Sequence, residues 1–182
     1  MSAYDIELAW LSGMLHDVGR FEQIKRYNTF SDADSVDHAK FGADLLFKDG
    51  LISTFLNGMV KCTGYKPGAL EDRYSSDGVF LYDRLNKSDM EMLELAIRCH
   101  NMYRIPQGLN RREQAFCNVL RDADKVDIFK VNIDTPLEEI YNTTTEELMK
   151  SDITDEVLDA FDEEHCILKA IRRTPADTVI GH

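Results

Sequence analysis

Apolar residues recur along this chain at the three- to four-residue spacing of amphipathic helices, and the alternation typical of strands is nearly absent. Ser2 and Asp5 have the spacing of a helix capping box, and an apolar run over residues 5–17 follows them. Gly19 then predicts a turn, and residues 21–27 predict a shorter helix. The chain is therefore expected to begin with two helices joined near Gly19.

Polar and turn-forming residues divide the middle of the chain into further elements. A polar loop over 28–35 is followed by predicted helices over 36–47 and 51–62. The stretch 63–78 is long for a loop in a compact domain, which makes it a candidate lid or entry loop. The best strand signal, at 78–82, is short.

Capping-box spacings also mark later helices. A box at 88–91 predicts a helix to about His100, and a box at 110–113 predicts a helix that passes through Asp124 and ends near Phe129. The pattern thus predicts two long helices in the second half of the chain.

The C-terminal part is acidic and is also expected to be helical. Residues 132–164 contain twelve Asp and Glu and one lysine, so most of the net charge of −12 belongs to this segment. Short helices are predicted around Leu137, Leu148 and Leu158, and the Thr-Pro-Ala-Asp sequence at 174–177 predicts one more helix start.

The composition restricts the class of protein. A chain of 182 residues with 43% hydrophobic and 30% charged residues is typical of one soluble globular domain. Neither a membrane-spanning run of roughly 20 apolar residues nor a signal peptide is evident. The absence of a basic stripe argues against general nucleic-acid binding. The widely spaced cysteines predict reduced thiols and hence a cytoplasmic protein: Cys62, Cys99, Cys117 and Cys166.

The candidate chemistry begins with the dipeptide His16-Asp17 at the end of the first apolar run. Such a pair offers one nitrogen and one oxygen to a metal ion. His38 and His100 have small or apolar residues one helical turn away, and Asp124 lies near an inward face of its helix. Because a buried carboxylate is costly unless it is paired or bound to a cation, the histidines are natural partners for Asp124.

Each of these residues also has a simpler interpretation. A lone histidine on an apolar face is more often a hydrogen-bonded core residue than a ligand. Asp124 could pair with Arg121 on a neighbouring turn. His165 lies in an acidic run and His182 is terminal, so neither is given a role.

The residues resemble those of the HD-domain superfamily of metal-dependent phosphohydrolases. The two halves of the family motif are similar to Met-Leu-His-Asp-Val-Gly-Arg at 14–20 and Asp-Ala-Asp-Lys-Val-Asp at 122–127. The resemblance covers about residues 8–130 and also includes Phe-Glu-Gln at 21–23, Asp-His-Ala at 37–39 with Gly42, and Ile-Arg-Cys-His-Asn at 97–101.

The resemblance implies a divalent metal site. His16, Asp17 and Asp124 would bind the metal, and His38 and His100 would hold a second metal or the substrate phosphate. Imidazole and carboxylate ligands suit Mn, Fe, Co, Ni, Zn or Mg. Such an ion polarises a phosphoryl oxygen and lowers the pKa of a bound water, which is the chemistry of phosphate ester hydrolysis.

Basic residues beside the motifs are candidates for holding a phosphate. Arg20, Arg104 and Lys125 are the predicted substrate-binding residues, and Asp17 and Arg20 the predicted catalytic ones. The alternative is that most of these basic side chains are solvated surface charges.

The resemblance also implies a histidine on a helix before the His-Asp pair, and none precedes His16. Together with the short helix predicted after Thr174, this indicates a chain truncated at both ends. We therefore expect an all-α, single HD-type helical domain over 1–182, with a motif-bearing core over 1–130 and an acidic helical part over 131–182.

The expected function is hydrolysis of a small phosphate ester or nucleotide with a divalent metal ion. A second hypothesis is a module that senses a nucleotide or metal without turnover, favoured by the lack of the first histidine. A third is a structural helical domain whose histidines pack in its core. Whether the chain forms a homo-oligomer stays open.

Overall fold

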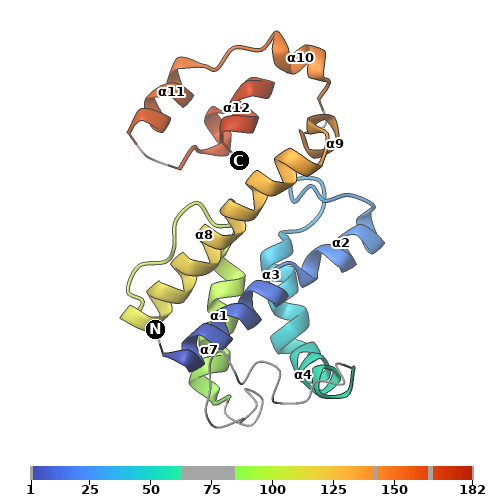
Figure 1. Ribbon diagram of the computed structural model, residues 1–182, viewed down its shortest axis with the longest axis vertical. Coiled ribbons are helices and arrows are strands. Elements are labelled where there is room, and N and C mark those ends of the chain that lie inside the picture. Colours follow the sequence, from blue (N-terminus) through green and yellow to red (C-terminus); the bar gives the residue numbers. More distant parts are fainter. Residues whose placement is uncertain (1, 63–84, 142, 164–165, 182) are drawn as a thin grey trace. The chain divides into compact units, whose positions relative to one another are not determined.

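The computed structural model is all-α, as predicted, and its described residues form no strand (Figure 1). It describes residues 2–62, 85–141, 143–163 and 166–181. The predicted lid over 63–78 and the weak strand at 78–82 lie outside this part of the chain. Among the described helices, none combines the length and the apolar character that a membrane span requires.

The chain divides into two compact units, 1–121 and 122–182. The division falls inside α8 (Arg111–Asp134). The sequence predicts the boundary between the two parts nearby, between residues 130 and 131.

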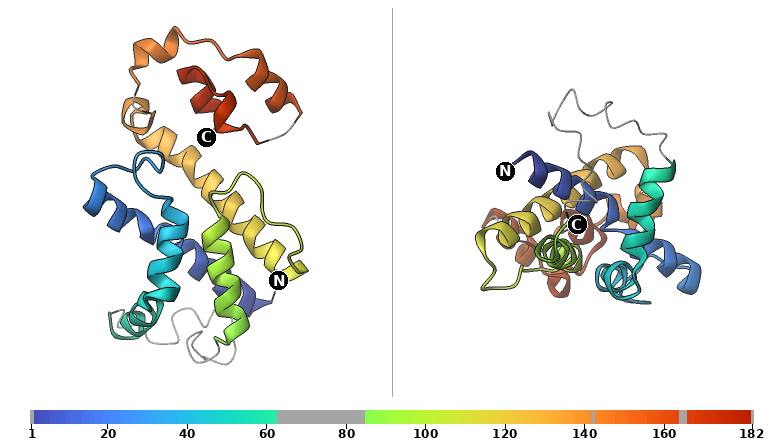
Figure 2. Two further views of the ribbon diagram at one scale, coloured as in Figure 1. Left: turned by 180° about the vertical axis from the view of Figure 1, so that it is seen from behind. Right: turned by 90° about the horizontal axis from the view of Figure 1, so that it is seen from below.

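The first unit contains the predicted helices in the predicted order. Its elements are α1 (Ala3–Leu15), α2 (Val18–Tyr27), α3 (His38–Ala43), the π-helical η1 (Asp44–Lys48), α4 (Leu51–Cys62), α7 (Lys87–Cys99) and the first part of α8. Helix α3 packs against α2 and α7, and α1 packs against α7 (Figure 2). The buried core is built from Leu8, Leu11, Leu15, Ala43, Leu46, Ile52, Leu56, Met92, Leu93, Ala96, Ile97, Phe116, Cys117 and Leu120.

Two of the predicted capping boxes are present. The Ser2 hydroxyl accepts a hydrogen bond from the Asp5 amide at 3.1 Å, and the Asp5 carboxylate accepts one from the Ser2 amide. Asn110 and Glu113 exchange the same pair of bonds at the start of α8. These local signatures define the two helix starts, because each satisfies amide groups that the helix itself leaves without partners.

Helix α7 begins with a different box from the predicted one. Asn86 and Asp89 cap each other, so the prediction of a box at 88–91 was wrong. Asp89 is fully buried and also accepts hydrogen bonds from the Tyr4 hydroxyl at 2.6 Å and the Arg112 guanidinium at 2.7 Å. Both partners come from other helices, so tertiary contacts favour the earlier start.

Helices α2 and α3 touch at two glycines. A Cβ atom built on Gly19 would lie 2.3 Å from the His38 carbonyl oxygen and 2.7 Å from the Gly42 amide nitrogen. Gly19 is therefore a packing residue inside α2, and the prediction of a turn there was wrong. The close approach brings the first residue of α3, His38, next to the start of α2, where Asp17 is the N-cap residue.

We predict that Gly19→Ala destabilises the protein by about 1–3 kcal/mol, because the added methyl group meets backbone atoms that cannot rotate away. Gly13→Ala is the matched control, since a Cβ atom there meets nothing within 4 Å. That substitution is expected to stabilise α1 by about 0.5–1 kcal/mol. Urea unfolding measures both changes, and equal stability of the two variants would contradict the packing role of Gly19.

The second unit contains the short helices predicted around Leu137, Leu148 and Leu158. These three helices are α9 (Leu137–Tyr141), α10 (Thr145–Met149) and α11 (Asp155–Asp162). The 3-10 helix η2 (Lys169–Ile171) and α12 (Pro175–Ile180) follow them. Helix α12 begins as predicted, with Thr174 and Asp177 forming its capping box. It packs against α9 and α10.

The Asp177 carboxylate is the polar centre of this unit. It is fully buried and accepts hydrogen bonds from the amides of Thr154 and Arg173, both at 2.8 Å, and of Thr174 at 3.1 Å. Burial raises the pKa of Asp177, but these hydrogen bonds outweigh it and lower the pKa from 3.8 to about 2. The ionised carboxylate therefore ties α12 to the segment before α11.

A lowered pKa in the folded state makes stability depend on pH. The contribution of Asp177 is fully present above about pH 4, the ordinary value, and is lost as the pH falls toward 2. We predict that Asp177→Asn lowers the melting temperature at pH 6 and that the difference from the parent protein shrinks between pH 4 and 2. Circular dichroism melts measure this difference, and a constant difference across that range would contradict the assignment.

Candidate metal centre

The His16-Asp17 pair lies between the first two helices. His16 is the C-cap residue of α1, and its Nδ1 donates a hydrogen bond to the Gly13 carbonyl at 2.6 Å. The last carbonyl groups of a helix have no partner within it, so this bond satisfies one of them. It also places the proton on Nδ1 and leaves a lone pair on Nε2.

Asp17 is the N-cap residue of α2, yet its side chain makes no capping hydrogen bond. An aspartate at this position usually accepts from amides of the first helical turn. Here the carboxylate instead lies beside the histidine side chains, with Oδ2 at 3.6 Å from His16 Nε2. Its position indicates a role outside the helix cap.

His100 repeats the arrangement of His16 at the end of α7. It is the C-cap residue, and its Nδ1 donates to the Ile97 carbonyl at 2.7 Å. The side chain is buried, and its ring centre lies 4.9 Å from that of His16, with the planes nearly perpendicular. Its Nε2 is therefore the nitrogen with a lone pair.

His38 is the first residue of α3 and is also buried. Its Nδ1 lies 2.8 Å from both carboxylate oxygens of Asp32. Burial raises the pKa of Asp32, but hydrogen bonds from His38 and Gln23 and the charge of Arg20 outweigh it and hold the pKa at about 2. An ionised carboxylate only accepts hydrogen bonds, so Nδ1 of His38 is the protonated nitrogen.

The Nε2 atoms and the Asp17 carboxylate converge on one place. Nε2 of His38 lies 3.1 Å from Nε2 of His100, and Oδ1 of Asp17 lies 3.3 Å from the first and 3.7 Å from the second. Ligand atoms of His16, Asp17 and His100 all lie within 4.8 Å of one another, a geometry that can hold a metal ion. Four predicted site residues thus meet within one unit.

A cation at this place would be favourable. With Nδ1 protonated in each ring, the facing Nε2 atoms of His38 and His100 are both acceptors and repel each other at 3.1 Å. Oδ1 of Asp17 is buried and makes no hydrogen bond, and a buried acceptor without a partner costs about 1–3 kcal/mol. Either a divalent ion or a proton between the rings relieves both conflicts, and the donor set fits a first-row divalent metal.

The electrostatics of Asp17 agree with a cationic surrounding. Burial raises the pKa of this carboxyl group, but a hydrogen bond from His100, the positive charges that His16 and His38 carry in their protonated forms, and the guanidinium of Arg20 lower it well below its usual range. Asp17 is therefore ionised at neutral pH and available as a ligand.

Arg20 is engaged by the protein itself. Its Nη1 donates to the Phe30 carbonyl at 2.9 Å and lies 3.8 Å from Asp32, while its Nε lies 3.4 Å from Asp17. These contacts orient Arg20 beside the site, and its predicted role in binding a phosphate stays a prediction. Arg104 is exposed and stacks on the Tyr103 ring at 5.4 Å, so its substrate role also stays a prediction.

Asp124 and Lys125 belong to the second unit, on α8. Their predicted roles as distal metal ligand and substrate-binding residue stay predictions.

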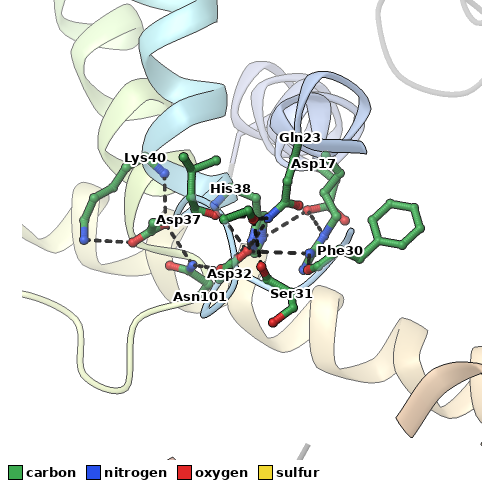
Figure 3. A network of polar contacts seen from close by, with 12 residues as sticks. Asp17, Gln23, Phe30, Ser31, Asp32, Asp37, His38, Lys40 and Asn101 are labelled. Carbon is green, nitrogen blue, oxygen red and sulfur yellow. Dashed lines mark hydrogen bonds and ion pairs between the residues drawn. The ribbon is translucent and has the colours of Figure 1, made fainter. Parts of the chain in front are cut away.

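Sequence reasoning missed the polar residues that support His38 (Figure 3). The Asp32 carboxylate also accepts hydrogen bonds from Gln23 Nε2 at 3.0 Å and Asn101 Nδ2 at 3.3 Å. Gln23 is fully buried and further donates to Ser35 and to the Val36 carbonyl. The available signal was an amide in the middle of a helix followed by a loop rich in Asp and Ser.

Protein-family models, curated proteins and solved structures give no match to the chain. The resemblance to the HD-domain superfamily therefore stays a prediction from the motifs at 14–20 and 122–127.

We predict that a divalent metal stabilises the folded protein. A site that exists only in the folded state adds about 2.7 kcal/mol when the free metal is 100-fold above its Kd. Urea unfolding with Zn²⁺, Co²⁺ or Mn²⁺, compared with chelator, measures the gain, and metal analysis gives the bound amount. In the His16→Ala, Asp17→Ala double variant the gain should vanish. An unchanged metal content in that variant would show that the site is not there.

Proposed function

We propose that the protein is a divalent-metal-dependent phosphohydrolase acting on a small phosphate ester or nucleotide. The observation that supports this most is the proximity of three imidazole groups to the Asp17 carboxylate, whose buried Oδ1 has no hydrogen-bond partner. His16, Asp17 and His100 would hold the metal, and His38 contacts two of these three residues.

A divalent ion at this position would polarise a phosphoryl oxygen and lower the pKa of a bound water. The residues of the chain would orient the ligand atoms toward the ion and position the water. His16 and His100 present lone pairs because their Nδ1 atoms are bound to carbonyl groups of their own helices. Asp17 supplies negative charge and an oxygen acceptor that can orient a water for attack on phosphorus.

A second candidate function is a module that senses a nucleotide or metal without turnover. The engagement of Arg20 by Phe30, Asp17 and Asp32 favours this candidate, because a guanidinium held by carboxylates is a weaker phosphate clamp than a free one. Calorimetry separates the two functions, since tight nucleotide binding without product formation supports only the sensor.

We predict that Asp17→Asn lowers kcat/KM by at least about 100-fold, the scale seen when an electrostatic contact to a transition state is removed. The measurement is turnover of a panel of phosphate monoesters, phosphodiesters and nucleotides with Mn²⁺, Co²⁺ or Mg²⁺. Asp44→Asn is the matched control, because Asp44 pairs with Arg98 and Lys48 outside the histidine cluster. Absence of turnover with every metal and substrate in the parent protein would overturn the enzymatic function.

A further inference from the structure

The structure assigns Asp32 as a positioning residue that keeps the proton of His38 on Nδ1, so that Nε2 of His38 stays a free acceptor facing Asp17 and His100. The consequence for metal binding rests on the function proposed above. The consequence for the position of the proton does not, because it follows from the contact between His38 and Asp32.

The location of His38 explains why it needs an external acceptor. His16 and His100 stand at C-terminal ends of helices, where carbonyl groups lack partners, and each donates to the carbonyl three residues earlier. His38 begins α3, and the start of a helix presents amide donors. The acceptor for its Nδ1 comes from the preceding loop, as the carboxylate of Asp32.

Asp32 is itself held by donors. Gln23 Nε2 reaches Oδ1 at 3.0 Å, Asn101 Nδ2 reaches Oδ2 at 3.3 Å, and the His38 amide lies 3.4 Å from Oδ1. Arg20 adds a positive charge 3.8 Å from Oδ1. These groups come from α2, α3 and the segment after α7, and they orient the carboxylate toward the ring of His38; Figure 3 shows Gln23, Asn101 and His38 around Asp32.

Without Asp32 the two facing rings have a simple alternative. If the proton of His38 moves from Nδ1 to Nε2, then Nε2 can donate to Nε2 of His100 across the existing 3.1 Å. That internal hydrogen bond would satisfy both rings and remove two lone pairs from the site. Because the hydrogen bond made by one ring nitrogen decides which nitrogen of a neutral imidazole is protonated, Asp32 disfavours this alternative and leaves both lone pairs for a cation, either a divalent ion or an added proton.

The first test observes the proton directly. Nitrogen-15 NMR of the full chain, with chelator at pH 8.5, reports which ring nitrogen of His38 is protonated. We expect a protonated Nδ1 in the parent protein and a protonated Nε2 in Asp32→Ala. Asp32→Asn, which keeps one acceptor oxygen, is the second variant should the alanine variant not fold, and a measurable fraction of protonated Nε2 is expected in it.

The second test measures affinity for Zn²⁺ alone by calorimetry. Outer partners of metal-binding histidines typically contribute 10- to 100-fold in affinity, so Asp32→Asn should bind Zn²⁺ at least about 10-fold more weakly than the parent protein. Asp37→Asn is the matched control, since it removes the same charge from a nearby residue. Asp37 binds Lys40 and Asn101, and asparagine caps a helix as well as aspartate does.

The outcomes separate this inference from the proposed function. A parent protein that binds no Zn²⁺ would overturn the proposed function, and the NMR comparison would still decide the role of Asp32. If His38 keeps its proton on Nδ1 in both Asp32 variants, or if Asp32→Asn binds Zn²⁺ as tightly as Asp37→Asn, the positioning role of Asp32 is wrong even in an active enzyme.

Discussion

Hydrogen bonds from the Nδ1 atoms of three histidines determine what this site can do. Two of these bonds run to carbonyl groups at helix ends and the third runs to Asp32. Each fixes a proton on the outer side of a ring and a lone pair on the inner side. The result is a cluster of acceptors that is unfavourable by itself and becomes favourable around a cation. The stability of the helical core has to offset that local cost.

Two helix–helix contacts, between α1 and α7 and between α2 and α3, bring the acceptor atoms together. His16 and His100 end helices that pack against each other through the core, which places two C-terminal ends side by side. The contact between Gly19 and Gly42 allows α3 to approach α2 until His38 lies 3.3 Å from Asp17. A side chain at either glycine would separate α2 from α3, so the geometry of the site depends on the absence of two Cβ atoms.

Much of the helical pattern could be predicted because helix starts and apolar stripes are local. The capping of α1, α8 and α12 follows from residues within one turn, and the predicted bounds of α4 agree with the observed ones. The start of α7 and the packing role of Gly19 could not be predicted, because both depend on contacts with other helices. In a sequence, a glycine usually indicates a flexible backbone. Only the position of α3 shows that Gly19 allows two helices to approach each other closely.

The candidate metal ligands could be predicted from the sequence, but the residues that orient His38 could not. His16, Asp17, His38 and His100 are residue types that bind metals, and inward-facing positions on helices made them candidates. Asp32 lies in a polar loop whose composition is typical of solvated turns, and Gln23 was noted only as part of the family motif, without a role. Their function in the structure depends on the position of one imidazole ring, which no spacing rule in the sequence specifies.

The most direct test of the account is the location of the cation. Crystals of the protein soaked with Co²⁺ or Zn²⁺ should show an anomalous scattering peak about 2.0–2.2 Å from Nε2 of His16, Nε2 of His100 and a carboxylate oxygen of Asp17. The absence of a peak at this position at saturating metal would contradict it.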